Sequence, residues 1–106
     1  QRQMCIRDRL RIYTINKGMM DSWINVFQEI LLPIHKKCGI PIVGAWTNLD
    51  RSEFIWVRSF STVEEIASKE SEYFATPERT ELGDLPGSHI AKIEVKVVES
   101  VVLPVA

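Results

Sequence analysis

Two hydrophobic periods follow one another along this chain in a fixed order, and that order most limits the possible fold. Apolar residues at every second position indicate a strand with two different faces, and apolar residues three and four apart indicate a helix with one buried side. Strand patterns lie over residues 10–15, 41–48, 53–59 and 89–98, and helix patterns lie over residues 20–38 and 61–71. The order β, α, β, β, α, β predicts a ferredoxin-like α+β domain, in which both helices cover one face of an antiparallel sheet.

The first predicted helix contains a proline and ends at a glycine. Its apolar positions recur at spacings of three and four: Trp23, Ile24, Phe27, Ile30, Leu31 and Ile34. Pro33 lies inside this helix, where its ring meets the carbonyl of Glu29 and its nitrogen has no proton to donate. We therefore expect a kink or a tightened turn there, and a left-handed stop at Gly39.

The reversal between the second and third predicted strands sets how their side chains pair. Residues 49–52 have the composition of a turn. If Leu49 pairs with Glu53 across a three-residue turn, Trp46 lies opposite Trp56 and the two indoles share a face. A slip of one residue would turn Trp56 to the other face, because side chains alternate along a strand.

The second predicted helix begins with a polar signal. The run Ser61-Thr62-Val63-Glu64 has the pattern of a capping box, in which Ser61 accepts from the Glu64 amide, and we expect a helix through about Ser71. The last predicted strand has one apolar and one charged face, since Ile93, Val95 and Val97 alternate with Lys92, Glu94 and Lys96.

This architecture leaves one face of the sheet without helices. The residues of both faces of the central hairpin are too apolar for water, with Val43, Ala45, Ile55 and Val57 in one set and Trp46, Phe54 and Trp56 in the other. The simplest cover for the second face is the same sheet of another copy. We therefore expect a homodimer with two-fold symmetry.

Composition excludes several classes of partner. The chain has 106 residues, 45% hydrophobic and 25% charged, which is typical of one globular domain. Its 13 basic and 14 acidic side chains are scattered, so no footprint for a nucleic acid or an anionic membrane is present. The apolar runs are far shorter than the roughly 18 residues of a membrane span. We expect neither nucleic-acid binding nor a membrane span.

The first nine residues, QRQMCIRDR, carry no apolar period and resemble translated sequencing-adapter sequence. We interpret residues 1–9 as a non-native tail, the alternative being a short ordered extension of the first strand. Without this tail Cys38 is the remaining cysteine, which excludes a disulfide framework or a metal cluster and fits a reducing, cytoplasmic location. No cofactor or metal is expected.

The run LRIYTINKGMMDSWINVFQEILLPIHKKCGIPIVGAWTN, residues 10–48, resembles the start of NIPSNAP-family domains. The matching positions are Leu10, Arg11, Tyr13, Thr14, Gly18, Leu32, Pro33, Gly39, Val43, Gly44, Ala45 and Trp46. The resemblance continues through FATPERTELGD into the last strand, so it covers residues 10 to about 103. It implies a ferredoxin-like domain paired into a dimeric α/β barrel. Relatives on that wider fold include cofactor-free monooxygenases, isomerases and haem enzymes, so it leaves the activity open.

Five residues are candidates for a ligand site. Trp46 and Trp56 could form a wall for a flat apolar ligand, or fill the core or dimer interface. Arg58 could pair with a carboxylate or form an interfacial ion pair. Tyr13, which shares a strand face with Arg11, could donate to a substrate oxygen, although such a tyrosine is more often part of the core. His35 could act as acid, base or haem ligand, or be a partly solvated residue near a helix end.

Two functions remain open from the sequence. One is a small homodimeric binding or interaction domain of uncharacterised activity that binds a small apolar molecule. The other is a cofactor-independent monooxygenase or isomerase acting on a small aromatic or carbonyl substrate. The first is favoured, because the sequence contains no nucleophile with an adjacent base and no paired carboxylates. Haem binding rests on His35 alone.

Overall fold

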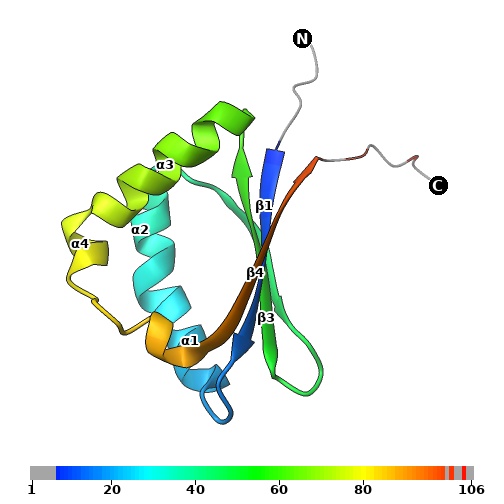
Figure 1. The fold of residues 1–106 in the computed structure, drawn as a ribbon, viewed down its shortest axis with the longest axis vertical. Helices are drawn as coiled ribbons and strands as arrows, with labels where there is room; N and C mark the ends of the chain where they lie inside the picture. Colours follow the sequence, from blue (N-terminus) through cyan, green and yellow to red (C-terminus); the bar gives the residue numbers. More distant parts are fainter. Residues whose placement is uncertain (1–6, 100, 102–103, 105–106) are drawn as a thin grey trace.

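The computed structural model describes residues 7–99, 101 and 104, and it has two layers, a sheet and a layer of helices (Figure 1). The elements are β1 Arg7–Ile15, α1 Met20–Val26, η1 Phe27–Leu31, α2 Leu32–Lys37, β2 Ile42–Thr47, β3 Glu53–Phe60, α3 Val63–Ala75, α4 Pro77–Thr80, η2 Gly87–His89 and β4 Ile90–Glu99. Among the described residues, no helix is long and apolar enough to cross a membrane.

The sheet has four antiparallel strands in the order β2-β3-β1-β4. Strand β1 is central, and Tyr13 pairs with Phe54 of β3 on one side and Ile93 of β4 on the other. The two strands that are adjacent to β1 in space are thus distant from it in sequence. This arrangement confirms the predicted ferredoxin-like α+β fold.

The helices all lie on one side of the sheet, and the core lies between the two layers (Figure 1). The centre of this core is aromatic. Its rings pack mostly edge to face with centroids 4.8–6.2 Å apart, the arrangement that aromatic pairs prefer, and they belong to Tyr13, Trp23, Phe27, Phe54 and Trp56. The apolar stripe predicted for the first helix supplies two of these rings.

The first predicted helix is continuous in sequence but changes its geometry before Pro33. Residues Phe27–Leu31 form a π-helical turn, in which the Leu32 amide donates to the Phe27 carbonyl five residues back. Pro33 then lies in the first turn of α2, where its missing N–H group costs no hydrogen bond. The expected local break is confirmed, but the turn is widened and not tightened. The helix ends as expected, at a left-handed Gly39.

The predicted register of the hairpin is wrong by one residue. Trp46 pairs with Ile55, and Trp56 pairs with Ala45, so the two indoles lie on opposite faces. The turn has four residues, because the Asn48 amide donates to the Glu53 carbonyl, and a bulge shifts the register again between Ile42 and Gly44. Trp56 is 2% exposed and Trp46 is 53% exposed.

The start of α3 also lies one residue later than predicted. Thr62 is the N-cap, and its hydroxyl accepts from the Glu65 amide, while the Glu65 carboxylate accepts from the Ser61 amide. The pair is therefore Thr62 and Glu65 instead of Ser61 and Glu64, and it differs from a capping box in that Glu65 accepts from the amide before the N-cap. The helix continues to Ala75, four residues beyond the predicted end.

Strand β1 begins at Arg7, three residues before the predicted start. Asp8 and Arg9 pair with both neighbouring strands. Residues 1–6 of the predicted non-native tail lie outside the described residues. The non-native origin of residues 1–9 stays a prediction.

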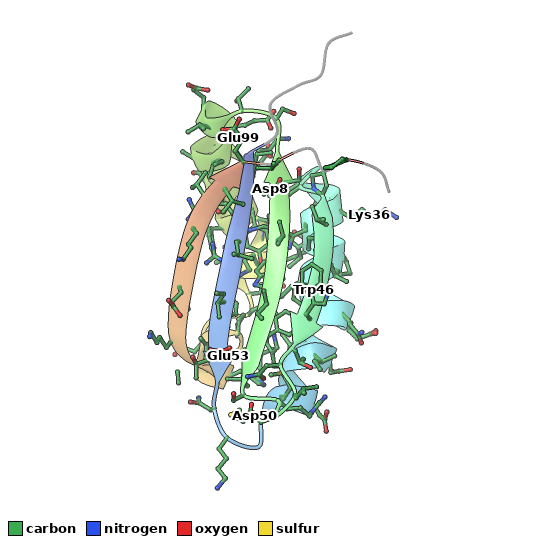
Figure 2. All side chains as sticks on the ribbon, turned by 90° about the vertical axis from the view of Figure 1, so that its right-hand side faces the viewer. Asp8, Lys36, Trp46, Asp50, Glu53 and Glu99 are labelled. Carbon is green, nitrogen blue, oxygen red and sulfur yellow. The ribbon has the colours of Figure 1, made fainter. Side chains whose placement is uncertain are left out.

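The sheet face opposite the helices carries an apolar centre, and we call it the open face (Figure 2). Its half-buried residues are Leu10, Ile12, Ile55 and Val57, and the Trp46 ring lies beside them on β2. Gly44 makes room for this ring, since a Cβ atom there would be 2.9 Å from Trp46 Cη2. Strand β4 is exposed on both sides, because Ile93 and Val97, which face the helices, are themselves about half exposed.

Candidate functional site

Four of the five predicted site residues converge between the sheet and the helices. Tyr13 on β1, His35 on α2, and Trp56 and Arg58 on β3 are all buried on the helix side. Trp46 is on the open face and does not join them. Strand alternation explains this grouping, because Trp56 and Arg58 are two residues apart and point to the same side.

A cavity of about 170 Å³ is lined by Tyr13, Trp56 and Arg58, whereas His35 contacts Arg58 and does not line it. Its polar lining consists of three arginines, Arg11, Arg58 and Arg79. Its aromatic lining consists of Tyr13, Trp23, Trp56, Tyr73 and Phe74. The cavity therefore combines a cationic part with large flat apolar surfaces.

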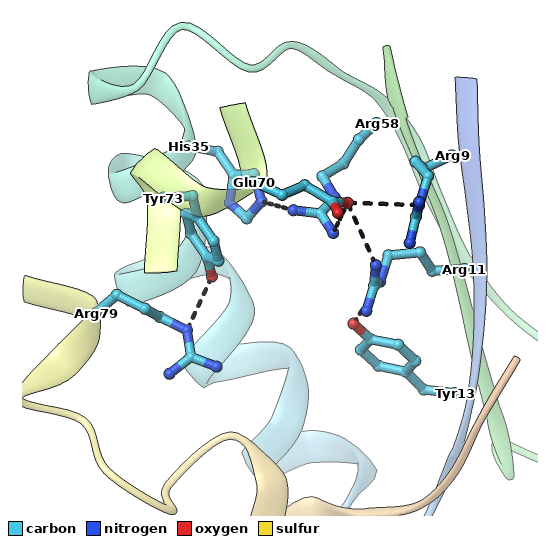
Figure 3. A network of polar contacts seen from close by, with 8 residues as sticks. All are labelled: Arg9, Arg11, Tyr13, His35, Arg58, Glu70, Tyr73 and Arg79. Atoms are coloured by element: carbon cyan, nitrogen blue, oxygen red, sulfur yellow. Dashed lines mark hydrogen bonds and ion pairs between the residues drawn. The ribbon is translucent and has the colours of Figure 1, made fainter. Parts of the chain in front are cut away.

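One carboxylate is shared among several guanidinium groups (Figure 3). Arg58 Nη2 donates to Glu70 Oε2 at 2.9 Å, and the same oxygen lies 3.7 Å from Arg11 Nη1 and 3.4 Å from Arg9 Nε. In the described ion pairs, Glu70 is the one acid that these arginines share. The cluster keeps an excess of positive charge after this pairing.

The two tyrosines accept hydrogen bonds from arginines at the edge of the cavity (Figure 3). Arg11 Nε donates to the Tyr13 hydroxyl at 2.8 Å, and Arg79 Nε donates to the Tyr73 hydroxyl at 3.2 Å. A phenol that accepts in this way keeps its own proton for donation. Burial raises the pKa of Tyr73, so this phenol stays protonated at neutral pH.

Three buried donors of the cavity lining have no acceptor among the described residues. They are the indole nitrogens of Trp23 and Trp56 and the Nε of Arg58. Buried donors in folded proteins are nearly always hydrogen-bonded, and leaving one unpaired costs about 1–3 kcal/mol. Three such groups therefore lie among the residues that line one cavity.

His35 holds Arg58 in place and is itself fully buried. Its Nδ1 donates to the Leu31 carbonyl at 2.8 Å, so Nε2 carries the lone pair and accepts from Arg58 Nη1 at 3.4 Å. Burial, with the nearby charge of Arg58, lowers the pKa of His35 to about 4, so the ring is neutral at pH 7. Both ring nitrogens are engaged, which leaves neither for binding haem iron or for taking a proton from a substrate.

Arg58 remains a cation despite its burial. The side chain is 1% exposed, and its guanidinium lies 5.0 Å from the Trp56 ring centre. Burial and the neighbouring Arg11 lower its pKa to about 10, while Glu70 opposes this effect. The group thus carries its charge at neutral pH in a site with little water.

Two larger grooves lie between the first helical segment and the β2 side of the sheet. One, of about 740 Å³, runs beside Pro33 and Ile40 and is also lined by His35. The other, of about 390 Å³, lies along β2 and includes Trp46. Their linings are mainly apolar and contain no cluster of buried charges. In the part of the chain that the structure describes, no group of three or more metal-binding side chains occurs.

Sequence reasoning missed three polar residues of the site, Glu70, Tyr73 and Arg79. Glu70 and Tyr73 are three residues apart on a helix, so a signal for a shared face was present. Arg79 lies on the short α4, and no pattern in the sequence connects it to β1 or β3.

Comparison with known proteins identifies relatives of the whole domain. The NIPSNAP family model matches residues 8–101. The comparison with curated proteins found no significant match. Among solved structures, an uncharacterised NIPSNAP domain protein from Burkholderia xenovorans superposes with a TM-score of 0.79, 16% identity and coverage of 94% of this chain and 95% of that chain.

Two further solved structures have the same fold. A NIPSNAP family protein from Agrobacterium tumefaciens has a TM-score of 0.82 and 15% identity, with 88% of this chain and 90% of that chain covered. A candidate antibiotic biosynthesis monooxygenase from Nitrosomonas europaea has a TM-score of 0.64 and 8% identity, with 94% of each chain covered. At these identities the similarity shows the fold alone.

Proposed function

The chain belongs to the NIPSNAP family, and from that premise we propose that it is a small-molecule binding domain that acts as a homodimer. Its ligand is a small, largely apolar molecule that occupies the cavity between the sheet and the helices. This remains a binding function, because His35 is the candidate base of the site and its lone pair accepts from Arg58.

The observation that carries this proposal is the set of unpaired donors around the cavity. Trp23, Trp56 and Arg58 line the cavity, and each has a buried donor without an acceptor among the described residues. Water can satisfy such donors, but the indole and phenol rings that form the rest of the wall are covered best by an apolar body. A ligand with a flat apolar part and one or two acceptors fits both requirements.

Toluene binding to the full-length chain tests this proposal by ligand-observed NMR. Ile93 lines the cavity from β4, so Ile93→Trp should fill the cavity without removing a donor. Val97 lies on the same side of the same strand but does not line the cavity, so Val97→Trp is the matched control. We expect binding by the original chain and the control and none by Ile93→Trp. Equal binding by all three would contradict the proposal.

The homodimer is supported by the open face. Leu10, Ile12, Ile55 and Val57 form an apolar patch with Trp46 beside it, and such a patch usually marks an interaction site. A second copy of the sheet would cover it by two-fold pairing. Sedimentation equilibrium should show a dimer that Trp46→Lys weakens. Leu49→Lys, in the exposed loop, should leave it unchanged. A monomer at all concentrations would contradict this pairing.

The alternative function is a cofactor-independent monooxygenase or isomerase. A specific observation favours it, since the cationic cavity would stabilise an enolate or phenolate formed in a reaction. Exchange of the α-hydrogens of acetophenone with D₂O, followed by NMR, separates the two functions. The binding function predicts no acceleration by the protein. Acceleration that Ile93→Trp abolishes would establish the enzymatic alternative.

A further inference from the structure

We propose that the ligand of this cavity is a carboxylate with a flat apolar body, and that Arg79, with Arg11 and Arg58 behind it, binds the carboxylate group. This inference rests on the proposed binding function and adds the chemical class of the ligand. It is carried by the balance of charge, by the free donors of Arg79 and by the size of the cavity.

The charges around the cavity do not balance. Arg11 and Arg58 share the single carboxylate of Glu70, and Arg79 has no acidic partner among the described ion pairs. Three guanidinium groups therefore face one carboxylate, and His35 next to Arg58 is neutral. Arg58 is 1% exposed, and an excess of positive charge around such a buried group is costly, which an anionic ligand would relieve.

Arg79 has donors that are free to bind a ligand. Arg79 uses Nε to bind Tyr73, and its two Nη groups have no acceptor among the described residues. Two Nη groups side by side are the fork that binds a planar carboxylate through two hydrogen bonds. The Tyr13 and Tyr73 hydroxyl protons and the Nε of Arg58 are further donors of the same lining.

The three arginines lie around one space. The guanidinium carbons of Arg11 and Arg58 lie 5.8 and 5.0 Å from the Trp56 ring centre. Those of Arg58 and Arg79 lie 5.8 and 5.7 Å from the Tyr73 ring centre. Arg58 thus lies between the other two along the aromatic wall, and the positive potential of all three is concentrated in one cavity (Figure 3).

The volume of the cavity limits the size of the ligand. The cavity of about 170 Å³ is close to the roughly 150 Å³ that accommodates benzene in a protein interior. One aromatic ring with a small charged group therefore suits it, and a nucleotide does not. Because most of the wall is aromatic, inorganic phosphate would satisfy the arginines and leave the apolar surface uncovered.

Isothermal titration calorimetry of the full-length chain tests this inference with four probes: benzoate, benzamide, toluene and inorganic phosphate. Benzamide has the shape of benzoate without its charge. Because hydrogen bonds to a charged group contribute about 1.5–3 kcal/mol, we expect benzoate to bind at least about tenfold more tightly than benzamide or toluene. Phosphate should bind more weakly than benzoate.

Arg79→Gln is the decisive variant, because Arg79 is on the short α4 and is not fully buried. It should weaken benzoate binding about tenfold and leave toluene binding unchanged. Arg51→Gln is the matched control, since Arg51 is in the exposed hairpin loop and pairs with Asp21. If Arg79→Gln fails to fold, Tyr73→Phe removes only a hydroxyl group and should weaken benzoate but not toluene.

The outcomes are distinct. Equal affinity for benzoate, benzamide and toluene would overturn the carboxylate inference and leave the proposed binding function in place. Binding of phosphate as tight as that of benzoate, with the same dependence on Arg79, would overturn the apolar body of the ligand. If none of the four probes binds, the binding function itself fails and the inference fails with it.

Discussion

Both faces of the sheet carry apolar side chains, but they differ in what covers them. The helix-facing side contains the aromatic core and, beside it, the arginines, His35 and Glu70. The open face has apolar side chains in its centre, including Trp46, and no cover within the described chain. One face therefore stabilises the fold and contains the candidate ligand site, while the other is the interface of the proposed dimer.

One hairpin supplies a tryptophan to each of these faces. Trp46 and Trp56 are of equal size and are separated by ten positions, yet one is 53% exposed and the other 2% exposed. Hydrophobicity is therefore not what distinguishes them. Their positions in the alternation of β2 and β3 decide which indole enters the core.

The largest expected effect separates the two tryptophans by stability. Trp56→Ala should lower the free energy of unfolding by about 3–5 kcal/mol, because it removes a ring from the packed core. Trp46→Ala should cost about 1 kcal/mol or less in the monomer, since half of its surface is already in water. Urea unfolding at several protein concentrations measures both values. Similar losses for the two variants at low concentration would break the comparison.

The next effect concerns the polar part of the helix-facing side. Burial lowers the pKa of His35 from 6.5 to about 4, so between these pH values the unfolded chain binds more protons than the folded chain. The free energy of unfolding therefore includes the whole contribution of neutral His35 above pH 6.5. This contribution, roughly 3 kcal/mol in total, is lost as the pH falls through about 4.

Urea unfolding between pH 7.5 and 4 checks this expectation when the same series is measured for His35→Gln. The difference in unfolding free energy between the two chains should narrow as the pH falls, because only His35 takes up the proton. Two curves that stay parallel over this range would show that His35 does not titrate as a buried neutral group. Since the open face has no such residue, Trp46→Ala should leave the pH dependence unchanged.

The smallest effect sharpens the description of the open face. A Cβ atom at Gly44 would lie 2.9 Å from the Trp46 ring, so Gly44→Ala should displace that ring. Because the ring is half exposed and able to move, the cost to the fold should be below about 1 kcal/mol. The dimer should be weakened, as measured by sedimentation equilibrium. An unchanged dimer together with a displaced indole signal would show that Trp46 is outside the interface.

The sequence was sufficient to predict the fold because each element has its own hydrophobic period. The order of β and α patterns, the helix stripe with Trp23 and the stop at Gly39 all depend on local spacing, and all are confirmed. The predicted start of the second helix was wrong by one residue. Thr62 and not Ser61 caps α3, and either residue fits the capping rule.

The hairpin register depended on a detail that spacing does not reveal. The Asn48 side chain accepts from the Ser52 and Glu53 amides, which fixes a four-residue turn in place of the expected three. Arg51 adopts a positive φ of 60° in that turn, a conformation for which the sequence offers no glycine as a signal. A one-residue difference in the loop was enough to move Trp46 to the other face.

The candidate site was predictable where strand alternation defined it. Alternation along β3 places Trp56 and Arg58 on one face, but it does not say which face of the sheet meets the helices. The structure brings both residues together with Tyr13 and His35. Glu70 and Arg79 join them only through the packing of α3 and α4 on the sheet. Contacts between elements that are distant in sequence are what a single sequence does not specify.

The indole signals in a two-dimensional ¹H–¹⁵N NMR spectrum distinguish the two faces of the sheet, because the chain contains three tryptophans, two at the cavity and one on the open face. On titration with benzoate, we expect the Nε1–H signals of Trp23 and Trp56 to shift as their donors meet an acceptor, while that of Trp46 stays in place. A shift of the Trp46 signal with the other two unchanged, or no shift in any of them, would contradict this expectation.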